Sequence, residues 1–394
     1  MSSRSTMDSP TRRRRPAVHR FSLRYLLVVP VLLAVLTGCV LFVHGDTNIY
    51  MLYSQCHARS RLPWLSRLPV LGGPACFLVS FFGEAVASAR AAGLMAAVLS
   101  FVAGLLTVST VEAARICNAP SRLIACPTAP WLVFDLVGGA FVWQLVIIPA
   151  FFRRTRDIIA ARKQQGGGGG PQPLSGPTDP TFGEAMRHLA SPAEAVAIPV
   201  AVALGFVLPA LLMLLLARPA AVLVWLFFPV WVSLVRRLAR RAALMLMARQ
   251  GWRRRGSHGS SGSSLHLESS RPALLAVYAL PVACSVLSHA LFIWTLTQPD
   301  DRKEMTRSAL KFITINIFFV GLTVLYWILV EAGWRVALVM VVASIVLGPG
   351  AGVCLGWVYR EKTVDLDRTV TVVAVGSRRQ SGDADPSEET PLLR

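Results

Sequence analysis

The hydrophobic residues of this chain fall into long continuous blocks, with short polar stretches between them. Most blocks are about 20 residues long, the length that a helix needs to cross roughly 30 Å of hydrocarbon. The most prominent stretch, 311–357, holds two blocks joined by a short turn that contains Glu331 and Arg335. A short join predicts two antiparallel neighbouring helices. A β-barrel would need short alternating strands, and the sequence lacks that pattern.

The pattern therefore predicts an all-α integral membrane protein, a polytopic bundle of about 8–9 transmembrane helices. The blocks expected to cross the membrane are Tyr25–Val43, Gly72–Ser88, Gly93–Val111, Trp131–Phe152, Glu194–Ala217, Ala220–Val235, Pro272–Leu296 and the two blocks of 311–357. We interpret the first block as a membrane anchor, because no small-residue cleavage site clearly follows it.

Polar and low-complexity stretches divide the chain. We expect a disordered basic tail over 1–24, a transmembrane domain over 25–362 and a disordered tail over 363–394. Two flexible linkers are expected inside the membrane domain, at about 164–190 and at about 253–271. The first contains a run of five glycines and the second is rich in serine and glycine, compositions that do not form a packed core.

Composition agrees with a membrane protein, since 54% of the 394 residues are hydrophobic and only 15% are charged. The formal net charge is +19, but the arginines cluster at the ends of apolar blocks, as in Arg12–Arg15, Arg153-Arg154 and Arg236-Arg237. Such clusters orient a membrane protein and contact anionic lipid, so we expect no nucleic-acid partner. These clusters predict that the N-terminus lies in the cytosol. We expect the protein to reside in the membrane of the endoplasmic reticulum or in another endomembrane.

The C-terminus is harder to place from the sequence. Nine spans would put it in the lumen, opposite the N-terminus. Arg360 and Lys362 follow the last block directly and favour the cytosol. The acidic dileucine-like pattern over 388–393 would also be read only in the cytosol. This conflict predicts that the span count is wrong by one.

Four carboxylates fall within or beside the apolar blocks, where a charge is expensive and usually functional. They are Glu84, Glu112, Asp135 and Glu331. The alternative is a residue at the interface that is solvated or paired with arginine. Arg115 lies three residues after Glu112 and Arg335 lies four residues after Glu331, both helical pairing distances.

Aromatic residues inside the blocks form a second set of candidates: Trp143, Trp294, Tyr326 and Trp327. They could form an interfacial belt or could line a pocket in which ring faces stabilise a cation. The cysteines form no CxxC motif, which argues against structural zinc. Cys117 and Cys126 share one short loop and could be paired or free.

Several enzyme motifs are absent from the sequence: the P-loop, GxGxxG, GxSxG and HExxH. No DDxxD-type cluster is present to bind a magnesium diphosphate, and Asp300-Asp301 is only a weak imitation. Any chemistry is therefore not expected to begin with ionisation of a diphosphate.

Three segments resemble a known family. They are WLVFDLVGGAFVWQLVIIPAFF at 131–152, VSTVEAARICNAPS at 108–121, and LTVLYWILVEAGWR with LGPGAGVCLGWVYREK near the C-terminus. The chain resembles, from about Pro69 to Lys362, the fungal membrane-bound terpene cyclases of the ascofuranone and macrophorin meroterpenoid pathways. The resemblance implies cyclisation of an epoxidised prenyl chain, on a phenolic or quinone-like head, by an acid-initiated carbocation cascade.

The resemblance also implies roles for particular residues. One of Asp135, Glu84, Glu112 and Glu331 would be the acid, since epoxide protonation needs a carboxylic acid kept neutral by burial. Substrate-binding roles would fall to Trp143, Trp294, Tyr326, Trp327 and Asn316. No cofactor or metal is implied, and the expected partners are a hydrophobic prenylated small molecule and membrane lipid. Relatives often carry carboxylates where this chain has Thr314 and Asn316, so the acid must lie elsewhere or this copy is altered.

Two other classes of function stay open. A secondary transporter, or an auxiliary membrane protein of a biosynthetic pathway, should show a continuous water-accessible path and internal symmetry. An interaction or sorting scaffold would depend on the basic linkers and tail and would tolerate loss of the buried carboxylates. A cyclase should instead have one closed apolar pocket with an acid on its wall.

Overall fold

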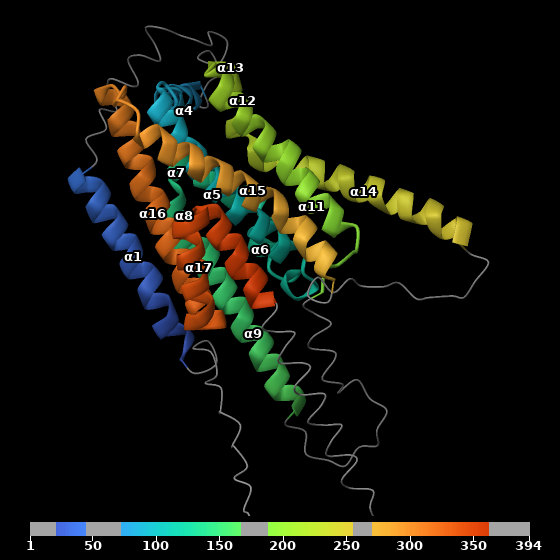
Figure 1. The fold of residues 1–394 in the computed structure, drawn as a ribbon. Helices are drawn as coiled ribbons and strands as arrows, with labels where there is room; N and C mark the ends of the chain where they lie inside the picture. The colour runs from blue at the N-terminus through green and yellow to red at the C-terminus, as the bar shows by residue number, and fades with distance from the viewer. Residues whose placement is uncertain (1–20, 45–71, 167–187, 255–269, 362–394) are drawn as a thin grey trace, which may run out of the picture.

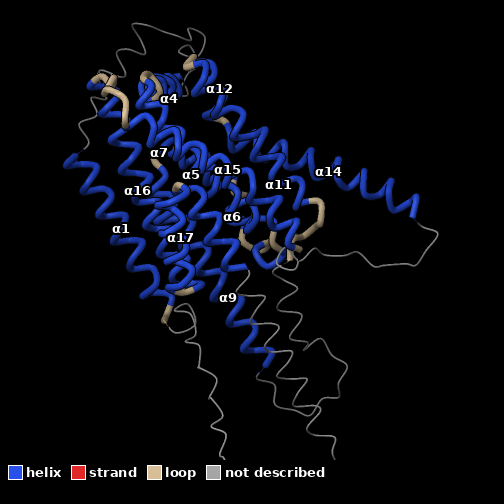
Figure 2. Tube along the Cα trace, in the orientation of Figure 1, coloured by secondary structure: helices blue, strands red, loops and turns tan. Residues whose placement is uncertain are grey.

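The computed structural model describes residues 21–44, 72–166, 188–254 and 270–361. These residues are almost entirely helical and contain no strand, which confirms the all-α prediction (Figures 1 and 2). The predicted C-terminal tail, and the greater part of the predicted N-terminal tail and of both predicted linkers, lie outside the described residues.

Five helical segments are long and apolar enough to cross a membrane. They are α1 (Leu23–His44), α5 (Ala89–Ala114), the segment from α11 (Glu194–Val202) through a π-helical turn to α12 (Leu208–Leu216), α15 (Arg271–Leu296) and α16 (Glu304–Ala332). A sixth consists of α13 (Pro219–Leu226) and α14 (Phe228–Arg254), which bend by 60° at their junction. The prediction of 8–9 spans is therefore wrong, and five or six is the number that the described residues support.

Three of the predicted spans are too short or are broken. The helix α4 (Gly72–Ala85) has only 14 residues. The block 131–152 breaks between α7 (Thr128–Val137) and α8 (Gly139–Val142), before continuing through a π-helical turn into α9 (Ile148–Gly166). The last block breaks after α17 (Trp334–Leu347), and residues 349–361 form a separate helical segment.

Both broken blocks fold back as helical hairpins. The breaks fall at Gly138 (φ 104°) and Gly348 (φ 94°), in a region of backbone space that glycine occupies without strain. In the first hairpin the rings of Trp131 and Trp143 lie 6.1 Å apart, so the two arms pack together. In the second, a Cβ added at Gly352 would lie 2.7 Å from the carbonyl oxygen of Met340, so those arms also touch. Each hairpin enters and leaves at one end of the bundle.

Both ends of the described chain lie at the same end of the bundle. On α9, Arg156 Nη1 donates to the carbonyl of Phe21 (3.1 Å), and the neighbouring Thr155 hydroxyl donates to Glu331 Oε1 (3.0 Å). Arg360 also donates to Glu331, through Nη2 at 3.1 Å. This placement agrees with six crossings, in which the bent α13–α14 pair counts as one span, and not with nine.

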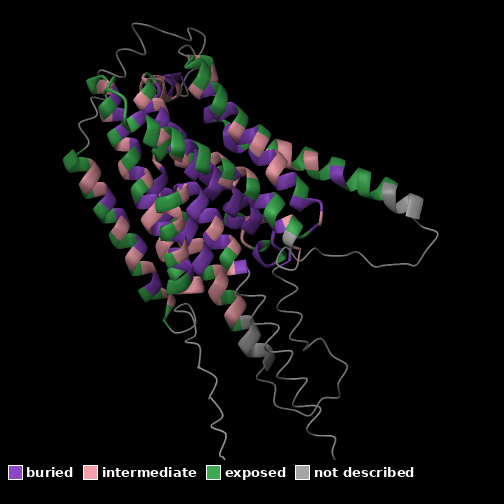
Figure 3. Cartoon of the chain, in the orientation of Figure 1, coloured by how far each residue is buried: buried purple, intermediate pink, exposed green. Residues whose placement is uncertain are grey.

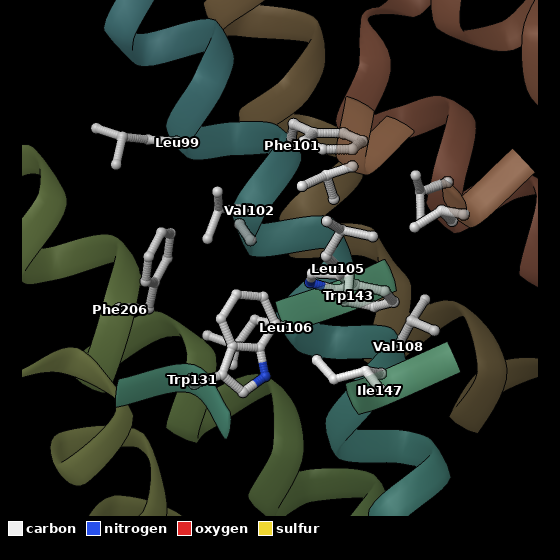
Figure 4. Packing of buried hydrophobic residues seen from close by; sticks show 14 of the residues in the cluster. Leu99, Phe101, Val102, Leu105, Leu106, Val108, Trp131, Trp143, Ile147 and Phe206 are labelled. Carbon is white, nitrogen blue, oxygen red and sulfur yellow. The ribbon is translucent and has the colours of Figure 1, made fainter. Parts of the chain in front are cut away.

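The helix α5 is the centre of the bundle and is buried along most of its length (Figure 3). Small residues allow close packing around it, since a Cβ at Gly350 would lie 2.4 Å from the Ser100 carbonyl oxygen. Figure 4 shows the side chains of Leu105 and Leu106 among the indoles of Trp131 and Trp143. In contrast, α1 lies on the outside of the bundle with much of its apolar surface exposed.

The two aspartates after α15 have structural roles. Asp301 Oδ2 accepts the backbone N–H of Ala89 at 2.8 Å and so caps the N-terminus of α5. Loss of solvent opposes ionisation of Asp301, but this hydrogen bond helps to keep its pKa below the ordinary value. Asp300 pairs with Arg302 and Arg307, and the hydrogen bond from Arg302 holds the pKa of Asp300 well below its usual range.

Candidate functional site

The middle of the bundle contains an apolar cavity of about 260 Å³. Its walls come from α4, α5, the tip of the α7–α8 hairpin, the junction of α13 and α14, and the first half of α16. Seven of the lining residues are aromatic: Phe77, Phe81, Phe82, Phe134, Trp225, Phe228 and Phe312.

The rings hold one another in place around the cavity. Phe81 on α4 lies edge-on to Phe312 on α16, with 5.7 Å between ring centroids. Phe82 makes the same kind of contact with Trp225 on α13 at 4.8 Å, and Trp225 lies 5.9 Å from Phe228. Contacts of this kind add to the stabilisation from buried area and fix the orientation of the rings. The cavity is therefore a shaped aromatic chamber.

Asp135 is the one ionisable side chain among the described residues that line this cavity. Its Oδ2 atom is buried and has no hydrogen-bond partner within the described part of the chain. Asn316, on the facing helix α16, donates through Nδ2 to the Phe312 carbonyl (3.1 Å). Its Oδ1 atom is buried and has no hydrogen-bond partner among the described residues. Buried polar atoms without partners are rare, so this pair indicates a place where a ligand completes the hydrogen bonding.

The hairpin places Asp135 at this depth. Asp135 lies in the last turn of α7, three residues before the break at Gly138. A Cβ at position 138 would lie 2.8 Å from Asn316 Oδ1, in addition to the strain of its positive φ. Glycine at this position therefore allows the tip of the hairpin to reach the middle of α16. An unbroken helix over 131–152 would not bring acid and amide to one cavity.

The cavity reaches the outer surface of the bundle beside Asp135. Leu136 and Val137 line the cavity and are 61% and 59% exposed. In a membrane, apolar residues exposed at this depth contact lipid. The cavity is therefore open to the outer surface of the bundle next to the acid.

Two of the other predicted acids belong to a buried ion-pair network at the end of α5. Glu112 Oε1 accepts from Arg360 Nη1 at 2.9 Å and from Trp357 Nε1 at 3.3 Å. Its carboxylate also pairs with Arg115 Nε at 3.2 Å, and Oε2 accepts from Asn118 Nδ2 at 3.2 Å. Glu112 is thus saturated by partners and does not line the cavity.

Glu331 belongs to the same network. It pairs with Arg360 and accepts from Thr155, as described above, and Arg115 pairs with Glu361. The expected partner four residues on, Arg335, lies instead over the ring of Trp334. Both glutamates are therefore paired with arginine, which is the alternative to a catalytic role. For Glu331 the paired arginine, Arg360, comes from a later helical segment and not from the next helical turn.

Glu84 does not join the cavity either. It lies near the end of α4, where its carbonyl accepts the N–H of Ala87 in the turn toward α5. Its side chain is half-buried and is not among the cavity residues. Of the four predicted carboxylates, Asp135 alone is among the described residues that line this chamber.

The predicted aromatic residues lie outside the cavity. Trp143 and Trp327 belong to a buried column with Trp131 and Trp357, in which the Trp143–Trp327 and Trp327–Trp357 centroid distances are 6.2 and 4.7 Å. This column is core packing. Tyr326 donates its hydroxyl to the carbonyl of Leu26 (3.0 Å), and Trp294 is 58% exposed on the outer surface. Of the five predicted binding residues, only Asn316 lines the cavity.

The aromatic rings that line the cavity are not among the residues predicted from the sequence. Phe77, Phe81 and Phe82 lie at helical spacings on α4, so a stripe of phenylalanine next to a candidate acid was the available signal. On α16, Thr314 is exposed while Asn316 is buried. Neither Cys117 nor Cys126 forms a disulfide, whereas Cys76 on α4 is disulfide-bonded.

A comparison with known families decides the membership of the chain. The CtvD domain matches residues 75–320, more than half of the protein. The chain belongs to the CtvD domain family. CtvD proteins are a family of fungal biosynthetic clusters, which is consistent with a meroterpenoid pathway. Comparisons with curated proteins and with solved structures give no match.

The CtvD match covers the site as a whole. Every residue that lines the aromatic cavity lies between 77 and 317, inside the matched segment. By contrast, Glu331, Trp357, Arg360 and Glu361 of the ion-pair network lie after it. The CtvD domain therefore contains the cavity, its acid and its amide, while the last hairpin packs against the domain from outside the match.

Proposed function

We propose that this protein is a membrane-bound cyclase that opens the epoxide of a prenylated phenolic substrate by protonation. One observation carries the proposal: among the described residues, Asp135, with an unpartnered buried carboxyl oxygen, is the single ionisable group on the wall of an aromatic cavity that is open to the outer surface of the bundle. The fungal biosynthetic-cluster family supports a small-molecule substrate of this class.

Asp135 would act as the general acid. Burial in an apolar wall without a cationic neighbour favours the neutral carboxylic acid over the carboxylate. The acid transfers its proton to the epoxide oxygen, and the bond from that oxygen to the more substituted carbon breaks. The oxygen becomes a hydroxyl group, and positive charge develops on the carbon.

The rings of the cavity would then stabilise the cation. The faces of Phe81, Trp225 and Phe312 carry the negative side of the aromatic quadrupole and replace the hydration that the dry cavity removes. A double bond of the prenyl chain attacks the cationic carbon and forms a ring, which moves the charge along the chain. Loss of a proton ends the cascade. The carboxylate left on Asp135 is a base available to take that proton, so substrate and product have the same mass.

Asn316 would orient the reacting end. Its Nδ2 is held by the Phe312 carbonyl, which leaves Oδ1 as an acceptor that points toward the tip at Gly138. An acceptor in this position can bind the Asp135 proton or a substrate hydroxyl. Asn316 cannot itself supply the proton, and this chain therefore depends on Asp135 for the acid.

The proposal is tested by making the substrate class available. The full chain is co-expressed in a host that produces epoxidised prenyl-phenols, and extracts are searched by mass spectrometry for a cyclised product of unchanged mass. We expect such a product with the parent protein and none with an empty vector. Unchanged substrate in both hosts, with folded protein present, would favour a transporter or auxiliary membrane protein.

The orientation of the bundle gives a separate prediction. Both ends of the described chain and the basic end of α9 lie at one end of the bundle, while the disulfide-bonded Cys76 lies on α4 at the other (Figure 1). Because disulfides persist in oxidising compartments and arginine-rich ends stay in the cytosol, we propose a cytosolic N-terminus. A glycosylation acceptor placed in 166–180 or in 256–270 should remain unmodified, whereas one placed in 45–71 should be glycosylated. The reverse pattern would invert this orientation.

A further inference from the structure

A second cavity, separate from the aromatic chamber, lies beside the basic end of α9. It has a volume of about 380 Å³ and lies between the segment 120–123 and the face of the helix that runs from Leu145 to Asp157. None of its lining residues lines the aromatic chamber.

The cavity is apolar along one part and charged along the other. Leu123, Leu145 and Val146 line it and are 52%, 50% and 36% exposed, so this part faces lipid. About two helical turns further along, the lining changes to Arg153, Arg154 and Asp157. This change from apolar to cationic along a single helix marks the boundary between hydrocarbon and headgroups.

One of the two arginines is held in position. Arg154 Nε donates to the carbonyl of Cys117 at 2.6 Å, which fixes the plane of its guanidinium. A fixed guanidinium binds the oxygens of a phosphate through paired N–H donors. The lining arginines outnumber the one lining carboxylate, so the charged part of the cavity favours an anion.

We propose that this cavity binds one anionic phospholipid, with its phosphate on Arg153 and Arg154 and an acyl chain along Leu145 and Val146. Charge complementarity supports the headgroup, and the lipid-facing apolar wall supports the chain. The basic end of the bundle is also the end proposed to face the cytosol, where the leaflet is rich in anionic lipid. This site does not depend on the proposed cyclase activity.

The test measures lipid binding to the purified full-length protein in a neutral detergent. Native mass spectrometry compares phosphatidylglycerol with phosphatidylcholine carrying the same acyl chains. We expect the parent protein to retain the anionic lipid preferentially. The double variant Arg153→Gln/Arg154→Gln should weaken phosphatidylglycerol binding by roughly 30-fold, since each cation near the headgroups contributes about a fivefold preference.

Two further variants make the test decisive. Arg237→Gln/Arg241→Gln removes the same charge from exposed positions on α14 outside the cavity and should leave the affinity within about twofold of the parent. Asp157→Asn removes the one acidic side chain from the lining and should tighten binding by about fivefold, even where the double variant fails to fold. Equal effects of the two arginine pairs, or no tightening with Asp157→Asn, would overturn the proposal. Displacement of the lipid by an equal concentration of glycerol 3-phosphate would also overturn it, because the acyl chain would then contribute nothing.

Discussion

Replacing Asp135 with asparagine should remove most of the cyclised product while leaving the folded protein in the membrane. The amide retains the shape of the side chain and can still make hydrogen bonds in the cavity, but it has no proton to transfer to an epoxide oxygen. Participation of a general acid is typically worth about 10²–10⁴-fold in rate. We therefore expect turnover to fall by a factor in that range.

The measurement must separate chemistry from folding and binding. Membranes containing equal amounts of folded parent and variant are incubated with the epoxidised substrate, and product is quantified against time and substrate concentration. Loss of a group that acts only in the transition state lowers kcat and kcat/KM together and leaves KM near the parent value. A rise in KM alone would indicate that Asp135 binds substrate but does not protonate it.

The matched control is Glu84→Gln, the same chemical change at a half-buried carboxylate outside the cavity. Its turnover should stay within a few-fold of the parent. If Asp135→Asn also stays within a few-fold, epoxide protonation by Asp135 is wrong. If Glu84→Gln loses turnover and Asp135→Asn does not, the reacting end of the substrate lies near α4, and the aromatic chamber is not where chemistry begins.

The class of the fold followed from the pattern of apolar blocks, because a helix that spans lipid must be both long and apolar. The number of spans did not follow. Gly138-Gly139 interrupts an apolar block of sufficient length, and glycine is common inside transmembrane helices. Only the positive φ of Gly138, at the point where the tip of the hairpin approaches Asn316 of α16, shows that this block turns back in the middle of the bundle.

The Gly348-Pro349-Gly350 sequence shows the same limit. Glycine and proline favour a helix break at this point of the sequence, and the structure places that break in the packed bundle, where Gly350 meets the backbone of Ser100. Glycine and proline in a sequence indicate where a helix breaks, but they do not indicate how deep in the bundle that break lies. Depth depends on which helix lies opposite, and that contact joins segments hundreds of residues apart.

The candidate acids were found from the sequence but not ranked by it. Asp135 and Glu112 both lie near the ends of apolar blocks, and what separates them is the partners that folding brings. Glu112 pairs with Arg360, far along the chain, whereas Asp135 lines a cavity together with phenyl rings and the amide of Asn316. A local spacing rule identified Arg115 correctly for Glu112, but for Glu331 it indicated Arg335 where the structure gives Arg360.

Replacing Glu112 with glutamine should destabilise the protein strongly without changing the chemistry of each folded molecule. The carboxylate lies between the guanidinium groups of Arg115 and Arg360, and both arginines are shielded from water. The amide cannot balance their charge, and its NH₂ group would face their N–H donors. Removing one partner from a buried network costs about 3–5 kcal/mol, because it leaves buried charge uncompensated.

Thermal unfolding of purified protein in detergent gives the measurement. A loss of this size corresponds to a fall of roughly 10 °C in Tm for a domain of this scale. The matched control is Glu304→Gln, at an exposed position in the first turn of α16, which should lower Tm by less than about 2 °C.

The same variant separates the structural role of Glu112 from a catalytic one. With product normalised to the amount of folded protein, Glu112→Gln should turn over within a few-fold of the parent, because the aromatic cavity does not include this side chain. An unchanged Tm together with a large loss of turnover would contradict the structural role and would move the acid to Glu112. A lowered Tm with retained turnover would show that Glu112 stabilises the fold and does not take part in the reaction. Its contacts would then hold the last hairpin against α5, and they involve Arg115, Trp357 and Arg360.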